Sequence, residues 1–264
     1  MAMLKFTSCM APSMDETCRS IADYLGARLG CDVEFIGDIA WTERERRFDS
    51  GEIQVCWICG LPYVWKSAAQ APIGLLAAPV MLAPRYAGRA VYYSDIVVHA
   101  QSDYREFSDL RGCRWVYNEP RSHSGYNVVR DHLARLGATQ GYFGETLESG
   151  AHQTSIRWIA ERRVDGSAID STVLELELAR TPELTASIRI IGALGPSPMP
   201  PWVTSHTMQP STRRALKRAL LAMHFDPKGA EILAQVRCAK FVAVRDSAYN
   251  PIRRMAANAG RVVF

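Results

Sequence analysis

Residues 118–125 read Asn-Glu-Pro-Arg-Ser-His-Ser-Gly, and they stand between a strand-like run (113–117) and a helix-like run (126–136). Two serines flank a histidine there and a glycine follows, so hydroxyls and free backbone N–H groups gather where a helix begins. A helix N-terminus carries a partial positive charge and unpaired donors, and it therefore favours a bound anion. The same stretch also suits a plain N-cap, because serine starts many helices that bind nothing.

The composition is that of an ordinary globular chain. Of 264 residues, 48% are hydrophobic and 22% are charged, which excludes a disordered protein. The net charge of +4 weakly favours anionic ligands, but no face rich in Lys and Arg appears, so we expect no nucleic-acid partner. The chain also lacks a run of about 18 apolar residues, and we expect no membrane insertion.

The N-terminal ten residues lack the apolar core of a signal peptide, and the cysteines number seven, an odd count that fits a reducing compartment. We therefore expect a cytoplasmic protein; the alternative is a periplasmic protein whose signal has been removed. Cys56 and Cys59 have redox or zinc spacing, but they fall in a strand-like run with no second pair nearby. We expect neither a metal nor a cofactor.

Strand and helix signals alternate along the chain. Residues 4–10 resemble a strand, residues 15–29 carry apolar side chains at helical spacing up to Gly30, and residues 31–36 resemble a second strand. Such β–α–β units predict an α/β fold with mainly parallel sheets flanked by helices. Further strands are expected at 53–59, 88–99, 113–117, 168–169 and 188–191, and further helices at 42–49, 126–136, 153–163, 211–223 and 228–235.

Two crossings between lobes are expected. One is the long extended run near Tyr93, and the other is the proline-rich stretch 195–201, which indicates a rigid break. A ligand would bind in the cleft between such lobes, and the lobes would close by hinging at the crossings. The predicted lobes are 1–93 plus 196–264 and 94–195, with crossings near 93–96 and 192–197.

Short motifs that fit one family occur in order along nearly the whole chain. They are Ala22-Asp23-Tyr24-Leu25, Ser50-Gly51-Glu52-Ile53, Tyr92-Tyr93-Ser94, Asp109-Leu110-Arg111-Gly112, Ser122-His123-Ser124-Gly125, Gly150-Ala151-His152, Arg163-Val164-Asp165-Gly166, Ala168-Ile169-Asp170-Ser171 and the return at 196–201. On these motifs the chain resembles the phosphate/phosphite/phosphonate-binding proteins of ABC transporters, a branch of the type II periplasmic binding proteins. The resemblance implies a two-lobed α/β fold, capture of a small oxyanion without catalysis, and the transporter's membrane subunits as partners.

The resemblance also implies a ligand site on the opening stretch. Ser122, His123 and Ser124, followed by Gly125, match a Ser-Thr-Ser stretch whose hydroxyls and N–H groups hold phosphonate oxygens. His123 departs from the family's threonine. It either turns into the cleft as an added donor or points away as a solvent-exposed cap.

Four further residues match the family's cleft. Tyr93 matches a tyrosine that contacts the anion, His152 a cleft histidine, and Trp41 an aromatic wall, although a core tryptophan fits Trp41 equally well. Asp170 matches a cleft aspartate. A carboxylate there would suit a monoprotonated phosphonate or an amine group on the ligand, whereas the alternatives are a helix N-cap for Asp170 and an ordinary polar role for His152.

Apolar stretches at 9–12 and 57–60 suggest an organic ligand with an anionic head and an apolar body. Two other functions stay open. One is an enzyme on the same fold, with Cys9 or Cys59 as nucleophile and His152 or His123 as base. The other is a ligand-sensing domain. Because the chain has no triad spacing, GxSxG turn or P-loop, a binding protein is the favoured interpretation.

Overall fold

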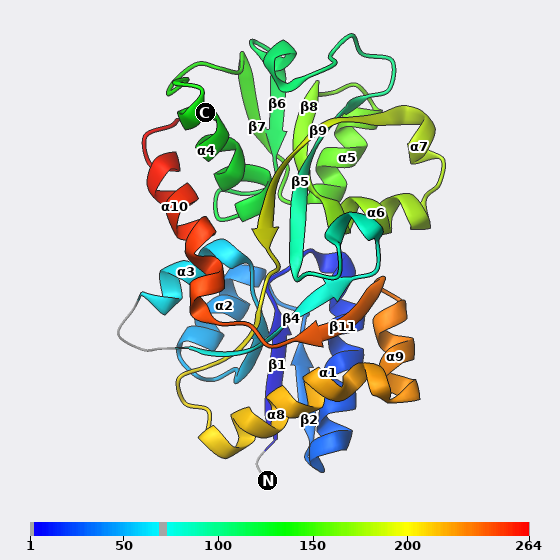
Figure 1. The fold of residues 1–264 in the computed structure, drawn as a ribbon, viewed down its shortest axis with the longest axis vertical. Helices are drawn as coiled ribbons and strands as arrows, with labels where there is room; N and C mark the ends of the chain where they lie inside the picture. Colours follow the sequence, from blue (N-terminus) through cyan, green and yellow to red (C-terminus); the bar gives the residue numbers. More distant parts are fainter. Residues whose placement is uncertain (1–2, 69–72, 264) are drawn as a thin grey trace. The chain divides into compact units, whose positions relative to one another are not determined.

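A computed structural model describes residues 3–68 and 73–263 of the chain. The chain divides into two compact units: unit 1 is Met1–Val91 with Pro198–Tyr249, and unit 2 is Tyr92–Ser197 with Asn250–Phe264. Figure 1 shows the course of the chain through these elements. Within the described ranges, no helix combines the length and the hydropathy that a bilayer crossing requires.

Unit 1 is built on a six-stranded mixed sheet in the order β11-β4-β10-β3-β1-β2. The neighbours of β1 run parallel to it, whereas β10 and β11 are antiparallel to their partners, so the sheet is less uniformly parallel than expected. The strands are β1 (Leu4–Ser8), β2 (Val33–Ile36), β3 (Val55–Trp57), β4 (Gly74–Met81), β10 (Trp202–Thr204) and β11 (Cys238–Val242). The helices are α1 (Asp15–Leu29), α2 (Trp41–Asp49), α3 (Gly60–Ser67), α8 (Pro210–Ala222) and α9 (Pro227–Ala234).

Unit 2 has a five-stranded sheet in the order β7-β6-β8-β5-β9. β7 and β8 are parallel to β6, and β5 is antiparallel to β8. The strands are β5 (Val91–His99), β6 (Arg114–Tyr117), β7 (Glu145–Glu148), β8 (Gly166–Asp170) and β9 (Ile188–Pro198). The helices are α4 (Val128–Arg135), α5 (His152–Ala160), α6 (Ser171–Arg180), α7 (Leu184–Ser187) and α10 (Asn250–Ala259).

Side chains of the unit 2 strands alternate between two hydrophobic clusters. Trp115 of β6 and Ile96 of β5 belong to one cluster, whereas their chain neighbours Val116 and Val97 belong to the other. This period of two places apolar residues on both faces of the sheet, where helices cover them. Each fully buried aliphatic side chain of this kind contributes about 1.5–3 kcal/mol to the free energy of folding. The packed sheet therefore holds the polar residues at its strand ends in fixed positions.

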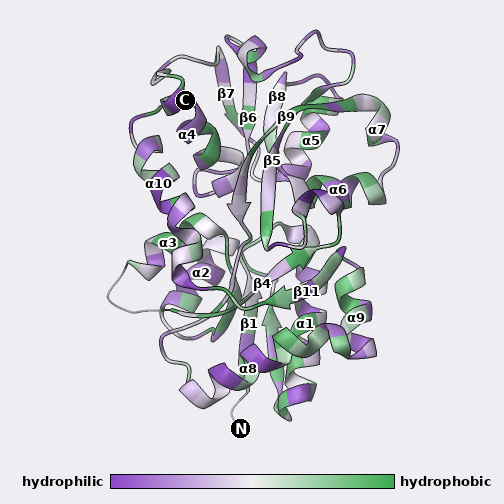
Figure 2. Ribbon diagram, in the orientation of Figure 1, coloured by the Kyte–Doolittle hydropathy of each residue, from purple (hydrophilic) through white to green (hydrophobic). Residues whose placement is uncertain are grey.

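Unit 1 also buries apolar side chains and exposes many polar ones. Figure 2 shows hydrophobic colour on β11 and a mixture of hydrophilic and hydrophobic colours along α8. The α8 helix buries only Leu216 and Leu220 among its described side chains, four residues apart on one face. One buried stripe on a polar helix is the arrangement that an outer helix of a globular domain requires.

Two sequence expectations differ from the structure at the second crossing and at the C-terminus. The proline-rich stretch is not a break, because β9 continues through a cis Gly195–Pro196 bond to Pro198. The C-terminal segment was expected in the first lobe, but α10 packs on α4 in unit 2. Asn258 donates a hydrogen bond to the Asp131 carboxylate over 3.0 Å, which fixes that packing.

Candidate functional site

The stretch that opened the sequence analysis forms the entry to α4. Ser122 is an N-cap residue, and its Oγ accepts a hydrogen bond from the Gly125 N–H over 3.1 Å. The next five residues, His123–Asn127, form a π-helical turn that continues into α4. The first N–H groups of a helix have no carbonyl partner within it, so the turn combines an observed cap with the kind of N–H groups that can bind an anion.

Gly125 allows this turn to pack closely on two polar side chains. A Cβ atom at Gly125 would overlap Asn118 Oδ1 and would lie 3.2 Å from His152 Cε1. Asn118 follows β6 directly, and its buried Oδ1 has no partner in the part of the chain that the structure describes. From the sequence Asn118 was given no role of its own, although its place at the carboxyl end of a parallel strand indicates a position where ligands bind in such sheets.

Ser124 is held by His152, the first residue of α5. Ser124 Oγ lies 2.9 Å from His152 Nε2, and both side chains are buried. Burial lowers the pKa of His152 to about 4, so the imidazole is neutral near pH 7. Among the described residues, its Nδ1 has no hydrogen-bond partner. The structure thus brings Ser122, Ser124 and His152 together.

Asp170 ends β8 and caps α6. Its Oδ1 accepts from the Thr172 N–H over 2.9 Å and from the Thr172 hydroxyl over 2.7 Å, so the N-cap alternative describes its local role. Burial raises the pKa of Asp170 to about 6 despite these hydrogen bonds. Strand pairing sets Asp170 opposite Ser94 on β5, next to the half-buried Tyr93, whose backbone N–H donates to Ser171 Oγ over 3.0 Å.

His123 takes neither of the two orientations expected from the sequence. It is fully buried, with Nε2 2.9 Å from Ser197 Oγ on β9 and Nδ1 3.1 Å from the Asn127 side-chain amide. Because that amide donates to Nδ1, the imidazole proton resides on Nε2 and points to Ser197. The edge of the buried Tyr92 packs against the ring, with 6.5 Å between centroids. His123 therefore ties β9 to the turn.

We expect His123→Gln to change stability against pH and to leave anion affinity within about threefold. Burial lowers the pKa of His123 to about 4 in the folded protein. The unfolded chain takes up a proton near pH 6.5 and the folded chain does not, so stability falls as pH drops from about 6.5 to about 4, by about 3 kcal/mol. Urea unfolding at pH 7.5 and pH 4.5 should show a smaller difference in the variant than in wild type. An unchanged pH dependence would contradict the buried placement.

Trp41 lies in unit 1, at the first turn of α2, and its carbonyl accepts from the Cys9 thiol over 3.9 Å. Trp57 packs in the core of unit 1. It is buried, stacks on Trp202 with centroids 5.8 Å apart, and donates to the Pro200 carbonyl over 2.9 Å. The expectation of an apolar ligand body, taken from residues 9–12 and 57–60, therefore gains nothing from Trp57 and stays a prediction.

The enzyme alternative loses support from the same geometry. His123 and His152 both have a pKa near 4, which makes them weak general bases at neutral pH. Cys9 Sγ lies 3.7 Å from Cys56 Sγ within unit 1. Within the described ranges, no group of three or more His, Cys, Asp or Glu side chains is placed to hold a metal ion.

Comparison with known proteins identifies the family of this fold. Residues 6–249 match the family model described as "ABC transporter, phosphonate, periplasmic substrate-binding protein". The chain belongs to this family. PhnD1 from Prochlorococcus marinus in complex with methylphosphonate is similar in fold, with a TM-score of 0.85, 17% identity, and coverage of 98% of this chain and 99% of that one.

Two further solved structures support the fold. A binding protein component of an ABC phosphonate transporter from Pseudomonas aeruginosa has a TM-score of 0.85 at 15% identity, covering 98% of this chain and 86% of that chain. A Xanthomonas citri protein bound to ATP has a TM-score of 0.77 at 17% identity, covering 99% and 98%. These phosphonate-binding proteins and their relatives share the α/β periplasmic-binding fold that the sequence predicted.

Proposed function

We propose that this phosphonate-family protein captures a small phosphonate or phosphate-type organic oxyanion as the substrate-binding component of an ABC uptake system. The observation that supports the proposal is the turn at Ser122–Gly125, in which two buried serines lie beside the first backbone N–H groups of the helix. The family's own description places such proteins in the periplasm, and we propose that location in place of the cytoplasm. The membrane subunits of the transporter would be its partners.

His152 gives this site a defined donor. We propose that the His152 proton resides on Nε2 and is donated to Ser124 Oγ, at the 2.9 Å separation between them. The Ser124 hydroxyl hydrogen is then free for an anion oxygen, because an oxygen that accepts from one side still donates from the other. His152 is thus a positioning residue for Ser124, and Ser122 Oγ, 3.4 Å from Ser124 Oγ, supplies the neighbouring hydroxyl.

Asp170 would select the protonation state of the ligand. A buried carboxylate with a pKa of about 6 is largely ionised at pH 7.5, and it repels a fully charged oxyanion unless a proton lies between them. A monoprotonated phosphonate provides that proton. Tyr93, one residue before the strand position opposite Asp170, remains a proposed contact of the anion, as does Trp41 of unit 1.

Isothermal titration tests the proposal. We expect saturable one-site binding of methylphosphonate or 2-aminoethylphosphonate at pH 7.5, and at least tenfold weaker binding of sulfate, which carries no proton at that pH. ATP belongs in the panel because a protein of the same fold binds it. A ligand at about 100 times its Kd should also stabilise the protein by about 2.7 kcal/mol in a thermal-shift assay. No heat and no shift with any phosphonate or phosphate ester would refute the assignment.

A further inference from the structure

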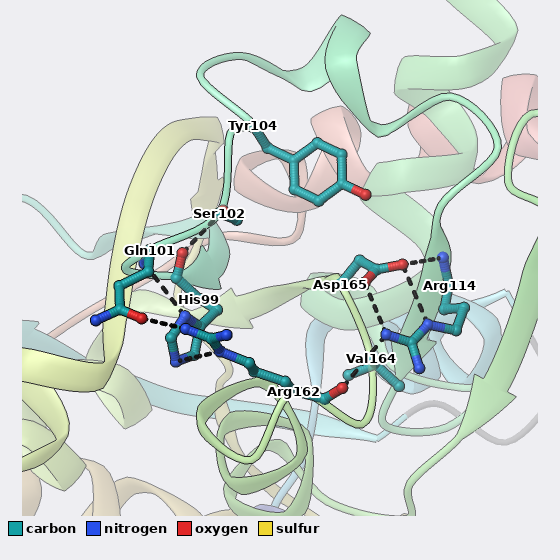
Figure 3. A pocket seen from close by; sticks show the side chains of 8 residues that line it. All are labelled: His99, Gln101, Ser102, Tyr104, Arg114, Arg162, Val164 and Asp165. Carbon is teal, nitrogen blue, oxygen red and sulfur yellow. Dashed lines mark hydrogen bonds and ion pairs between the residues drawn. The ribbon is translucent and has the colours of Figure 1, made fainter.

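Unit 2 contains a cavity at the end of its sheet opposite the Ser122–Gly125 turn. β5 ends there with His99, and β6 and β8 begin there. β8 ends with Asp170 at the opposite end of the strands. The five residues of β8 separate the two ends of the sheet, measured along the strands, by about 13 Å. The cavity has a volume of about 200 Å³, and Figure 3 shows His99, Gln101, Tyr104, Arg114, Arg162 and Asp165 around it.

One side of the cavity is electrically neutral. Arg114 Nη2 lies 2.9 Å from Asp165 Oδ1, and Asp165 Oδ2 also accepts from the Arg114 backbone N–H over 2.7 Å. Arg114 Nη1 donates to the Arg163 carbonyl over 2.8 Å, and Arg114 Nε donates to Asp165 Oδ2 over 3.3 Å. Each guanidinium nitrogen of Arg114 therefore has a hydrogen-bond partner. The positive charge of Arg162 is not balanced by a counterion, since no described carboxylate lies within ion-pair distance of it.

On the other side, two N–H groups are directed at one imidazole ring. The Gln101 backbone N–H donates to His99 Nδ1 over 3.1 Å, and Arg162 Nε donates to His99 Nε2 over 3.3 Å. Because a neutral imidazole accepts at only one ring nitrogen, His99 satisfies only one of the two N–H groups. The Arg162 Nη2 donates to Gln101 Oε1, which holds the guanidinium in place beside the imidazole. The N–H group that is left without an acceptor, beside the unbalanced charge of Arg162, is an arrangement that an oxyanion satisfies.

The backbone of Arg162 supports a role for its side chain. Arg162 follows α5 with a φ of 57°, in the left-handed region where glycine is the usual residue after a helix. A non-glycine residue at such a position is disfavoured by its Cβ atom, and arginine has no backbone advantage there. Its side chain extends toward His99 and Gln101 (Figure 3). The left-handed backbone conformation of Arg162 thus places its guanidinium at the cavity.

We infer that this cavity binds a compact oxyanion, a phosphate, a sulfate or a small carboxylate, through the Arg162 guanidinium beside the His99 imidazole. The Tyr104 hydroxyl lines the same space. The site is separate from the Ser122–Gly125 turn and does not rest on the function proposed for it. Asp165 is compatible with an anion here because Arg114 neutralises it.

Nuclear magnetic resonance of histidine labelled with nitrogen-15 tests the inference at the cavity itself. Inorganic phosphate, and acetate in a second arm, are titrated at pH 7.5 with ionic strength held constant by chloride, and the His99 ring signals are followed. We expect a saturable shift in wild type, at least tenfold weaker binding in Arg162→Gln, and intermediate affinity in Arg162→Lys, which keeps the charge and loses the planar fork. Saturation by phosphate alone, or by acetate as well, decides which oxyanion class the site takes.

Arg163→Gln is the matched control. It removes the same charge one residue later, where the Arg163 guanidinium lies over the Trp158 ring at 4.5 Å, and it should leave the affinity within twofold. The variant Ser122→Ala with Ser124→Ala should keep the His99 response, which separates this cavity from the helix-end site. Equal losses in Arg162→Gln and Arg163→Gln, or a His99 shift that never saturates, would overturn the inference in favour of general charge screening.

Discussion

Replacing both serines of the turn, Ser122→Ala with Ser124→Ala, is expected to weaken methylphosphonate binding by roughly 100- to 10,000-fold. In the proposed site each serine donates one hydrogen bond to a charged oxygen, at about 1.5–3 kcal/mol, and the two losses fall on the same ligand group. The Ser124 change also leaves His152 Nε2 without its partner at 2.9 Å. Isothermal titration of the folded variant measures the effect directly.

Stability has to be separated from affinity in that variant. Ser122 caps the turn by accepting from Gly125, and losing a cap costs about 1 kcal/mol. Asp226→Ala removes an equivalent cap in unit 1, where the Asp226 carboxylate accepts from the Gly229 N–H over 3.1 Å. We expect this control to be destabilised to a similar degree with unchanged affinity. A folded serine variant with wild-type affinity would remove the turn from the ligand site.

Asp170→Asn is expected to stabilise the ligand-free protein at pH 7.5 by up to about 3 kcal/mol, since burial raises the pKa of Asp170 from 3.8 to about 6. Between about pH 4 and pH 6 the folded state holds a proton that the unfolded state has released. The contribution of Asp170 to stability is therefore greatest below pH 4 and is lost as pH rises to 6. Asparagine keeps an oxygen for the Thr172 N–H and removes the buried charge.

Urea unfolding at pH 4.5, 6 and 7.5 measures this contribution. Asp109→Asn is the contrasting control, because Asp109 is exposed and backbone N–H groups of Arg105 and Glu106 lower its pKa. That variant should gain no stability at pH 7.5. In titrations, Asp170→Asn should bring sulfate closer to methylphosphonate in affinity. A variant as stable as wild type at every pH, with the same ligand ranking, would contradict both roles given to Asp170.

Local signals in the sequence predicted several of the helices and the position of the turn at the start of one of them. The apolar spacing and Gly30 predicted a helix at 15–29, and α1 is Asp15–Leu29 with Gly30 at a φ of 65°. Ser122 was predicted to start a helix, and it is the N-cap residue. Both features depend on residues within one or two helical turns of each other, so their physics is contained in a short window of sequence.

The strands β4, β7, β10 and β11 were not predicted, and neither was α10. β10 has only three residues, Trp202–Thr204, and it is a strand because β3 and β4 flank it on both sides. The buried residues of α10 are Ile252 and Ala259, and they identify a docked helix only once α4 is beside them. Segments of this kind gain their structure from partners that lie far away in the sequence.

The sequence by itself determined the α/β character of this phosphonate-family protein, its helix-end turn and the residue types of the candidate site. Only the tertiary structure decided where each side chain points. His123 stands between two serines of the turn, yet its partner is Ser197, 74 residues later, and burial turns it from a candidate ligand donor into a structural tie. A residue's neighbours along the chain set its backbone conformation, whereas its burial and its hydrogen-bond partners depend on how distant segments pack.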